Sequence, residues 1–426
     1  MIYRMKSILT TVMSVVLAAS IFPMAACAQP APVPEPKPLE SEAIAYALSL
    51  GVGWNLGNSF DAHVEGISGE TLWGNPKVTP ELFKRLKAAG FSSVRIPITW
   101  MGHIGKAPEY RIEKAWMDRI AEVVSWAHNN DLKVIINIHH DGFGAEKDLS
   151  RQAYHWLDLP AAAKDEQKNT EIMQKLAMVW MQIANRFQND GDWLMFEVLN
   201  EIQDGNWGGG ENLTDGGAMY RTLNDWNQLC VDIIRSTGGN NATRYIGIPS
   251  FVCQPDKAVK YLRLPEDSAA NRLLVSVHIY DPWDYAGSAK YSEWGHSGKD
   301  IVPDSKGEED YNATLDALYN KFVRRGVPVY VGEYGCVHRN TKKAEEFRKY
   351  YLEYTVKSLR NHKMPVFVWD NANPGTGEEA FGLIRHDNGK FINNAEEIVR
   401  IIIDSWNNND PAYTLPSIYN RAPEAK

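Results

Sequence analysis

The sequence predicts a (β/α)8 barrel that forms a single domain. About eight short apolar runs, rich in β-branched and aromatic residues, alternate along the chain with longer amphipathic stretches. The 426 residues, 44 % of them hydrophobic, are enough for one large barrel. Neither an internal repeat nor a second linker interrupts the region from Ser41 to Trp406. An open doubly wound sheet is the alternative, but no glycine-rich phosphate-binding loop follows any of the runs.

The apolar runs have the length and composition of buried strands in a parallel sheet. We expect strands at Gly51–Leu56, Ser93–Ile98, Lys133–His139, Leu194–Leu199, Arg244–Ile248, Leu273–Tyr280, Val327–Gly332 and Pro365–Asp370. The stretches between them carry apolar residues three to four apart, which predicts helices. These helices are expected at Pro80–Ala89, Lys114–Asn129, Glu171–Phe187, Met219–Thr237, Tyr311–Arg325, Lys342–Leu359 and Ala395–Ile403.

Residues 1–27 are expected to be a signal peptide. Two basic residues precede an apolar stretch, Ile8 to Phe22, that is too short to span a bilayer comfortably. The small residues before Cys27 resemble a bacterial lipoprotein signal, which is cut before a cysteine whose thiol then carries lipid. Met24 stands where such signals usually have leucine, so cleavage near Ala28 without lipidation remains the alternative.

The rest of the chain divides into three parts. Alternating prolines over residues 28–40 predict an extended spacer. The catalytic barrel is expected over residues 41–408, followed by a polar surface tail over residues 409–426. The protein is therefore expected to be exported, as an outer-membrane or cell-surface lipoprotein or otherwise in secreted or periplasmic form. A lipid anchor would be its only contact with a membrane.

Composition excludes several classes of function. The net charge is −8 and no Lys/Arg cluster stands out, so a nucleic-acid partner is not expected. Beyond Cys27 only Cys230, Cys253 and Cys336 remain, too few for a disulfide framework. We expect buried free thiols, although one disulfide is left open. No cofactor is expected, and the protein is expected to be a monomer.

Two glutamates, Glu201 and Glu333, follow buried runs at the points where we expect strands to end. A carboxylate there is rigidly held and partly desolvated, which is costly unless chemistry uses it. In a barrel the carboxyl ends of all strands meet at one face, where catalysis takes place. Two such groups predict acid/base and nucleophilic carboxylate catalysis, with a structural ion pair as the alternative for each. The same strand ends carry Arg95, His139, His140, Asn200, His278, Tyr280 and Trp369.

Seven short segments, in this order along residues 51 to 370, resemble glycoside hydrolase family 5, a family of retaining β-glycanases. They are G-W-N-L-G-N (53–58), V-R-I-P (94–97), I-H-H-D (138–141), L-N-E (199–201), V-H-I-Y (277–280), V-G-E-Y-G (331–335) and V-W-D (368–370). The segment E-T-L-W-G-N-P (70–76) resembles subfamily 4, which holds endoglucanases, xyloglucanases and lichenases. One departure is Ile202, which follows Glu201 where the family often has proline.

The resemblance implies a role for each of these side chains. Glu333 would be the nucleophile, kept ionised by Arg95 and hydrogen-bonded by Tyr280. Glu201 would give its proton to the leaving oxygen and then act as the base for water. Asn200 would bind the 2-hydroxyl of the sugar in the transition state.

Five further residues are assigned less directly. His278 would lie against Glu201, and His139 with His140 would bind sugar hydroxyls, although His140 can equally be a core histidine. Trp369 would stack under the sugar, with core packing as the alternative. Asn58 would act near the nucleophile or cap a turn.

Metal binding and outer subsites are the last open points. No metal is expected at the His-His-Asp run, because it lacks a helical metal motif and adjacent strand residues point to opposite faces. Trp207 and Trp283 are predicted to line outer sugar subsites and Trp294 is a further candidate, with loop packing almost equally expected for each.

The sequence thus predicts an exported, retaining endo-β-1,4-glucanase (a cellulase) that acts on β-glucan by double displacement. Its long loops, Asp141–Thr170, Ile202–Ala218 and Pro282–Asp310, can wall a cleft for an extended polymer. Xyloglucan, mixed-linkage glucan and mannan remain alternative substrates, and exo-action or transglycosylation alternative activities. A non-catalytic carbohydrate-binding lipoprotein is the alternative from another class.

Overall fold

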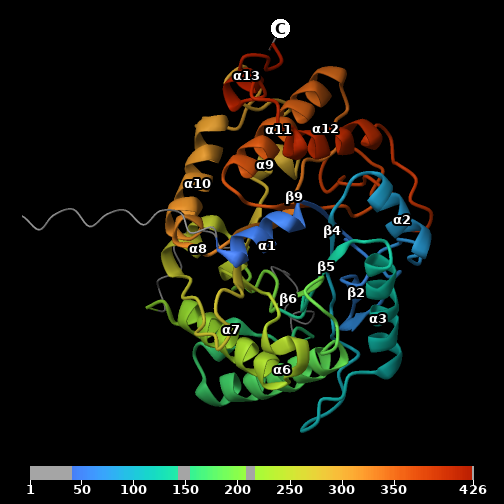
Figure 1. Ribbon diagram of the computed structural model, residues 1–426, viewed down its shortest axis with the longest axis vertical. Helices are drawn as coiled ribbons and strands as arrows, with labels where there is room; N and C mark the ends of the chain where they lie inside the picture. Colours follow the sequence, from blue (N-terminus) through green and yellow to red (C-terminus); the bar gives the residue numbers. More distant parts are fainter. Residues whose placement is uncertain (1–40, 143–153, 208–215, 425–426) are drawn as a thin grey trace, which may run out of the picture. The chain divides into compact units, whose positions relative to one another are not determined.

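The computed structural model describes residues 41–142, 154–207 and 216–424 (Figure 1). The predicted signal peptide with Cys27, the linker over residues 28–40 and parts of two of the long loops lie outside the described residues. Among the helices of the described ranges, none combines the length and the apolar character needed to cross a bilayer.

Eight parallel strands close into a barrel, which confirms the predicted (β/α)8 fold. The strands are β1 Val52–Asn55, β4 Ser93–Ile96, β5 Lys133–Asn137, β6 Leu194–Glu197, β7 Ile246–Pro249, β8 Leu273–Ile279, β9 Val329–Tyr334 and β10 Val366–Val368. Each lies within a predicted run or extends it by one or two residues. A separate two-stranded antiparallel sheet, β2 His63–Val64 and β3 Ile67–Ser68, was not predicted.

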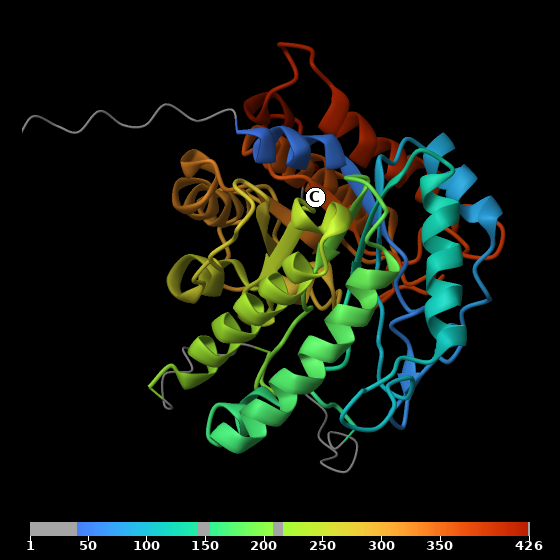
Figure 2. The same cartoon turned by 60° about the horizontal axis from the view of Figure 1, so that its bottom comes forward.

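Amphipathic helices cover the outside of the barrel; α6 and α7, for example, lie side by side in Figure 2. The longer helices are α2 Pro80–Ala88, α3 Lys114–His128, α6 Glu166–Arg186, α7 Ala218–Ser236, α10 Glu308–Lys321, α11 Lys342–Asn361 and α12 Ala395–Asn407. The shorter ones are α5 Leu159–Ala162, α8 Pro255–Tyr261 and α9 Trp283–Ala286. Helix α6 begins five residues before the predicted start because Asp165 caps its polar first turn, accepting hydrogen bonds from the N–H groups of Gln167 and Lys168.

The barrel has an inner and an outer apolar core. The outer core fills the space between strands and helices. The inner core includes Ile135, Met195, Tyr330 and Phe367 and is covered by helix α1, Glu42–Leu50, which the apolar periodicity did not predict. Space inside is so tight that a Cβ on Gly53 would stand 2.2 Å from the Phe367 ring. The inner core therefore forms a rigid floor beneath the carboxyl ends of the strands.

The polar surface tail predicted for residues 409–426 contains a packed helix, α13 Leu415–Tyr419, and is corrected accordingly. Thr414 and Ser417 form a capping box at its start, and Ile418 is fully buried while the helix packs on α11. A helix of five residues is too short for apolar periodicity to predict it from the sequence.

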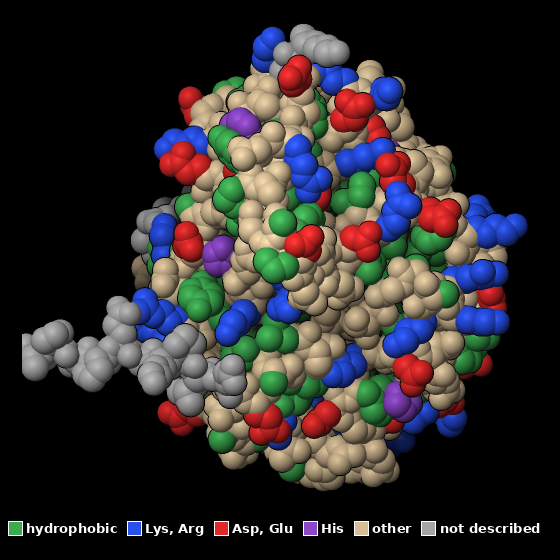
Figure 3. Space-filling view, turned by 45° about the horizontal axis from the view of Figure 1, so that its top comes forward, with side chains coloured by type: hydrophobic (Ala, Val, Ile, Leu, Met, Phe, Trp, Pro, Cys, Tyr) green, Lys and Arg blue, Asp and Glu red, His purple; other side chains and the backbone are tan. Residues whose placement is uncertain are grey.

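Cys230, Cys253 and Cys336 are buried free thiols, so the disulfide left open by the sequence does not form among them. Trp294 is 2 % exposed and packs against Tyr350, Tyr351 and Tyr354, which gives it the packing role rather than a subsite. Acidic and basic side chains are interspersed on the face shown in Figure 3, without one large basic patch.

Candidate active site

Strand β9 carries a β-bulge that aims Glu333 into the barrel. Val331 pairs with Val277 of β8, but the next pair joins Glu333 to His278, so β9 has one residue more than its neighbour. Tyr330 belongs to the inner core and Val331 to the outer one. Strict alternation would turn Glu333 outward with Val331, and the extra residue, Gly332, reverses that direction.

Glu201 and Glu333 meet at the carboxyl ends of the strands. An oxygen of each carboxylate and a ring nitrogen of His278 all lie within 4.8 Å of one another. The side chains of Glu201 and Glu333 are 18 % and 7 % exposed, so both are largely desolvated yet reached by solvent. The two carboxylates can therefore act on one bond of a bound molecule.

Glu333 is surrounded by donors and positive charge. Arg95 donates to its Oε1 at 2.8 Å and the Tyr280 hydroxyl to its Oε2 at 3.1 Å, as the sequence predicted. Burial raises the pKa of Glu333, with Glu201 adding to the rise, while His278 and Arg95 act to lower it. The contacts with Arg95 and Tyr280 fix the direction of the carboxylate.

Glu201 has a single hydrogen-bond partner, His278, among the side chains of the described residues. Burial raises its pKa to about 7, with Arg95 opposing the rise and Glu197 supporting it. Nδ1 of His278 lies 2.7 Å from Glu201 Oε1, the predicted contact. Burial lowers the pKa of His278 to about 4, so this imidazole is neutral near pH 7.

The proton of the neutral His278 ring can be placed. Its Nε2 is buried and has no hydrogen-bond partner among the described residues. A buried N–H without an acceptor is costly, so the proton belongs on Nδ1 and is donated to Glu201 Oε1. The proton of a neutral Glu201 is then left on its other oxygen, Oε2. One carboxyl that protonates near neutral pH beside a second carboxyl oriented by Arg95 and Tyr280 is what cleavage of a glycosidic bond requires.

Glu197 is a third carboxylate of the site, and the sequence analysis gave it no role. Its side chain is fully buried in the barrel and accepts hydrogen bonds from Arg95, Asn137, Ser276 and Tyr330. A signal was present, because a charged residue inside the otherwise apolar run Leu194–Leu199 needs a buried partner. The sequence alone did not show which residue that partner is.

The prediction that His139 and His140 point to opposite faces of a strand requires a correction. Strand β5 ends at Asn137, so both follow the strand rather than alternate along it, and their ring centroids are 4.3 Å apart. His139 is buried, whereas the His140 side chain is 31 % exposed and therefore reached by solvent. Ring nitrogens of both and a carboxylate oxygen of Asp61 lie within 4.8 Å of one another. The opposite-face argument against metal binding is therefore wrong.

The predicted aromatic residues divide into two kinds. Trp369 is 8 % exposed and stacks parallel to His139 with ring centroids 6.1 Å apart, so it lies beside the carboxylate pair. Trp207 and Trp283 are 54 % and 42 % exposed; Trp207 lies on the loop after β6, and Trp283 begins the short helix α9 after β8. Asn58 occupies a turn with a φ of 56°, where its N–H donates to Asp61.

The loop that carries Glu201 keeps its shape without the proline common in the family. Ile202 donates its N–H to the Asn200 carbonyl at 3.0 Å, and its own carbonyl accepts from Val252 at 3.0 Å. The Cys253 thiol reaches the Asn200 carbonyl at 3.7 Å. Val252 and Cys253 both have positive φ, a conformation costly for these residues. The neighbouring strained turn thus supports the loop.

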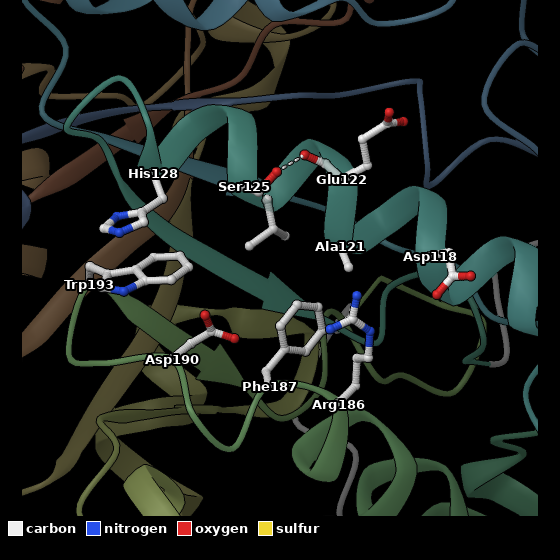
Figure 4. Close-up of a pocket in the computed structure, with 10 residues that line it drawn as sticks. Asp118, Ala121, Glu122, Ser125, His128, Arg186, Phe187, Asp190 and Trp193 are labelled. Carbon is white, nitrogen blue, oxygen red and sulfur yellow. Dashed lines mark hydrogen bonds between the residues drawn. The ribbon is translucent and has the colours of Figure 1, made fainter.

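A hollow of about 380 Å3 lies elsewhere, between α3 and α6 near the starts of β5 and β6 (Figure 4). His128 stacks on Trp193 there, at 3.8 Å between ring centroids, and Arg186 lies over Phe187. The ends of α3 and α6 place it at the opposite end of the barrel from Glu201 and Glu333. It therefore has no part in the site described above.

Known proteins are similar to this chain in sequence and in architecture. The profile of the Cellulase family (glycosyl hydrolase family 5) matches residues 57–375. A solved Bacteroidetes-affiliated GH5 cellulase linked with a polysaccharide utilization locus is 58 % identical, with a TM-score of 0.89 over 91 % of this chain and 99 % of that one. For a GH5-4 broad specificity endoglucanase from Bacteroides salanitronis the identity is 44 % and the TM-score 0.82, over 90 % of this chain and 100 % of that one. Endoglucanase A of Paenibacillus barcinonensis is 35 % identical over 354 residues, which are 79 % of this chain and 84 % of the relative. The chain belongs to the cellulase family, glycosyl hydrolase family 5.

Proposed function

We propose that the protein is a retaining endo-β-1,4-glucanase in which Glu333 is the nucleophile and Glu201 the acid/base. The observation that carries this proposal is the carboxylate pair, whose oxygens approach within 4.8 Å in one solvent-reached site. Retaining enzymes hold the two carboxyl groups about 5–5.5 Å apart, whereas inverting enzymes need about 6.5–9.5 Å to admit a water molecule. The short separation supports double displacement with net retention.

The neighbouring side chains complete the proposed mechanism. Glu333 attacks the anomeric carbon while Glu201 gives its proton to the leaving oxygen, and Glu201 then activates water against the ester. Arg95 and Tyr280 orient Glu333, and His278 orients Glu201. These three residues act through the carboxylates they contact.

The remaining site residues are proposed to bind sugar. Asn200, buried beside Arg95, takes the 2-hydroxyl, while His139 and His140 bind other hydroxyls and Trp369 stacks on the ring. The turn at Asn58 shapes the same subsite. The exposed rings of Trp207 and Trp283 are proposed to line outer subsites.

Substrates are proposed in the order cellulose derivatives, mixed-linkage glucan, xyloglucan and mannan. The names of two relatives support cellulose as the first of these and leave room for other glucans, since one is a cellulase and another a broad-specificity endoglucanase. Both carboxylates are present and in contact with orienting groups, which disfavours the non-catalytic sugar-binding alternative.

A time-resolved product analysis tests the function. We expect the first sugars released from a soluble mixed-linkage glucan to carry the β configuration, because two inversions restore it. Viscosity is expected to fall before many reducing ends appear, because an endo-acting enzyme cuts within chains. Proton NMR of the first minutes and paired viscometry would measure both. Release of α-anomers would refute retention. A viscosity that falls only in proportion to the reducing ends released would indicate exo-action.

The pH dependence follows from the two carboxyl groups. We expect kcat/KM to decline as pH rises through about 7, because Glu201 then loses the proton it must donate. At the acid end kcat/KM declines as Glu333 is protonated, above the usual glutamate pKa of 4.5 because burial raises it. Rates on soluble glucan across this range measure both limbs. A constant kcat/KM well into alkaline pH would contradict proton donation by Glu201.

For the location we propose an exported lipoprotein anchored through Cys27, with residues 28–40 as its spacer. The small residues before Cys27 and the proline-rich stretch after it support this proposal. Labelling of cells with a radioactive fatty acid, lost in Cys27→Ala, is the test. Unlabelled protein released into the medium or periplasm would support simple secretion.

A further inference from the structure

Glu197 lies below the reacting groups and has no part in the two-carboxylate mechanism. Its Oε2 accepts from Arg95 and Asn137, and its Oε1 accepts from Ser276 and Tyr330, all at 2.7–2.8 Å. Glu197 and Arg95 are both fully buried. A buried carboxylate with every acceptor position occupied is expensive to install and is held in one orientation.

Arg95 connects Glu197 to the site above it. The guanidinium donates from Nε and Nη2 to Glu197 and from Nη1 to Glu333. Nη2 also donates to Oδ1 of Asn200 at 2.7 Å. One cation thus lies between two carboxylates, and the Glu197–Arg95–Glu333 group carries a net charge of −1.

Other titratable groups face this cluster and leave its net charge unchanged near pH 6. Burial keeps the pKa of His278 and His139 low and that of Tyr280 and Tyr330 high, so these four are neutral. Burial raises the pKa of Glu201, Asp61 and Glu379 to about 7, so these three are mostly protonated. The cluster therefore supplies the fixed charge of the site.

We propose that Glu197 is a positioning residue that aligns the guanidinium of Arg95 on Glu333 and Asn200 and keeps the cluster anionic while the sugar becomes cationic. This inference rests on the proposed function. In glycosylation an oxygen of Glu333 forms a bond to the anomeric carbon as the bond to the leaving oxygen breaks and takes the proton of Glu201. Glu333 becomes a neutral ester, and Arg95 remains neutralised by Glu197.

Without the charge of Glu197, the same step becomes unfavourable. Arg95 would face an oxocarbenium-like transition state with its only countercharge, Glu333, being consumed. Two positive charges would then approach each other in a buried site, where their repulsion is weakly screened. Before the reaction, Arg95 would also hold Glu333 more firmly as an anion and reduce its nucleophilicity.

The test is Glu197→Gln, which removes the charge and preserves the contacts. The amide oxygen can accept from Arg95 and Asn137, while the amide N–H groups can donate to the hydroxyl oxygens of Ser276 and Tyr330. We expect kcat to fall on the order of 100-fold with KM changed less than about 3-fold, because the loss falls on the transition state. The acid limb of kcat/KM is expected to move down by about one pH unit, because Glu333 ionises more readily.

Two further variants separate this role from a structural one. Tyr330→Phe keeps the charge but removes a donor from Glu197, so the field of Glu197 on Glu333 grows and the acid limb should move up. If Glu197→Gln does not fold, the upward shift of the acid limb expected for Tyr330→Phe tests the inference by itself. Glu308→Gln is the matched control, a carboxylate 3 % exposed and bonded to His296 and Tyr350, whose loss should alter thermal stability and not the acid limb.

Unchanged kcat and an unmoved acid limb in folded Glu197→Gln would overturn the inference, as would shifts of the same sign in Glu197→Gln and Tyr330→Phe. Parallel assays of Glu333→Ala and Glu201→Ala distinguish failure of the proposed function from failure of the role given to Glu197. If those variants are inactive on polymer while Glu197→Gln is fully active, the proposed function stands and only the role of Glu197 fails.

Discussion

Glu333→Ala is expected to lower kcat on soluble glucan by a factor on the order of 10^5, equivalent to about 7 kcal/mol of lost transition-state stabilisation. The covalent step loses its attacking oxygen, and no other carboxylate of the described residues lies in its place. Glucan binding should persist, because the sugar contacts proposed for Asn200, His139 and Trp369 remain. Reducing-end assays and affinity electrophoresis measure the two effects separately.

The product formed by Glu333→Ala in the presence of azide is a second measurement. The alanine leaves space beside Arg95 where a small anion can replace the carboxylate, and one displacement by azide on a substrate with a good leaving group inverts the anomeric centre. We expect an α-glycosyl azide. The control is Glu379→Gln, an exposed carboxyl whose pKa is raised as that of Glu333 is, and its kcat should change less than about 10-fold. Polymer cleavage retained in Glu333→Ala would disprove the nucleophile assignment.

Glu201→Ala is expected to slow polymer cleavage on the order of 10^3-fold, because an alkoxide leaving group then departs without a proton. An aryl β-cellobioside with a good leaving group needs little protonation, so it should still form the glycosyl-enzyme and release a burst of phenol. The following hydrolysis should be slow, since no base activates the water. Stopped-flow measurement of the phenol gives both rates.

The azide product distinguishes this variant from Glu333→Ala. Azide can attack the glycosyl-enzyme without a base, and the second inversion gives a β-glycosyl azide. The alkaline limb of the pH profile should also disappear for the activated substrate, because the group that produces it is absent. An α product, or full activity on polymer, would show that the roles of Glu201 and Glu333 are misassigned.

Most of the site could be predicted because its residues lie at strand ends. Arg95 and His278 each stand one residue before the end of a strand, Asn200 and Tyr280 follow strands, and all strand ends of a parallel barrel meet at one face. The contact between Arg95 and Glu333 was expected from the resemblance to glycoside hydrolase family 5, and the shared face of the strands explains why the two residues meet. Loop residues were harder, because Trp294 and Asn58 occupy places that depend on packing between loops.

Two features of the molecule could not be predicted locally. Glu197 is a charged residue inside an apolar run, but only the closed barrel shows that Arg95 is its partner. Helix α1 was not predicted. Its buried side chains pack against strand residues far along the chain, and the sequence alone does not place those residues beside it. Both depend on contacts between segments distant in sequence.

The sequence by itself determined which residues the protein places at the carboxyl ends of its strands, because apolar periodicity and strand length are local properties of the chain. Only the tertiary structure decided which way Glu333 points, because the bulge at Gly332 is set by the register of β9 against both neighbouring strands. It likewise decided that Arg95 is shared between Glu197 and Glu333, since closure of the barrel brings three strands around one buried guanidinium.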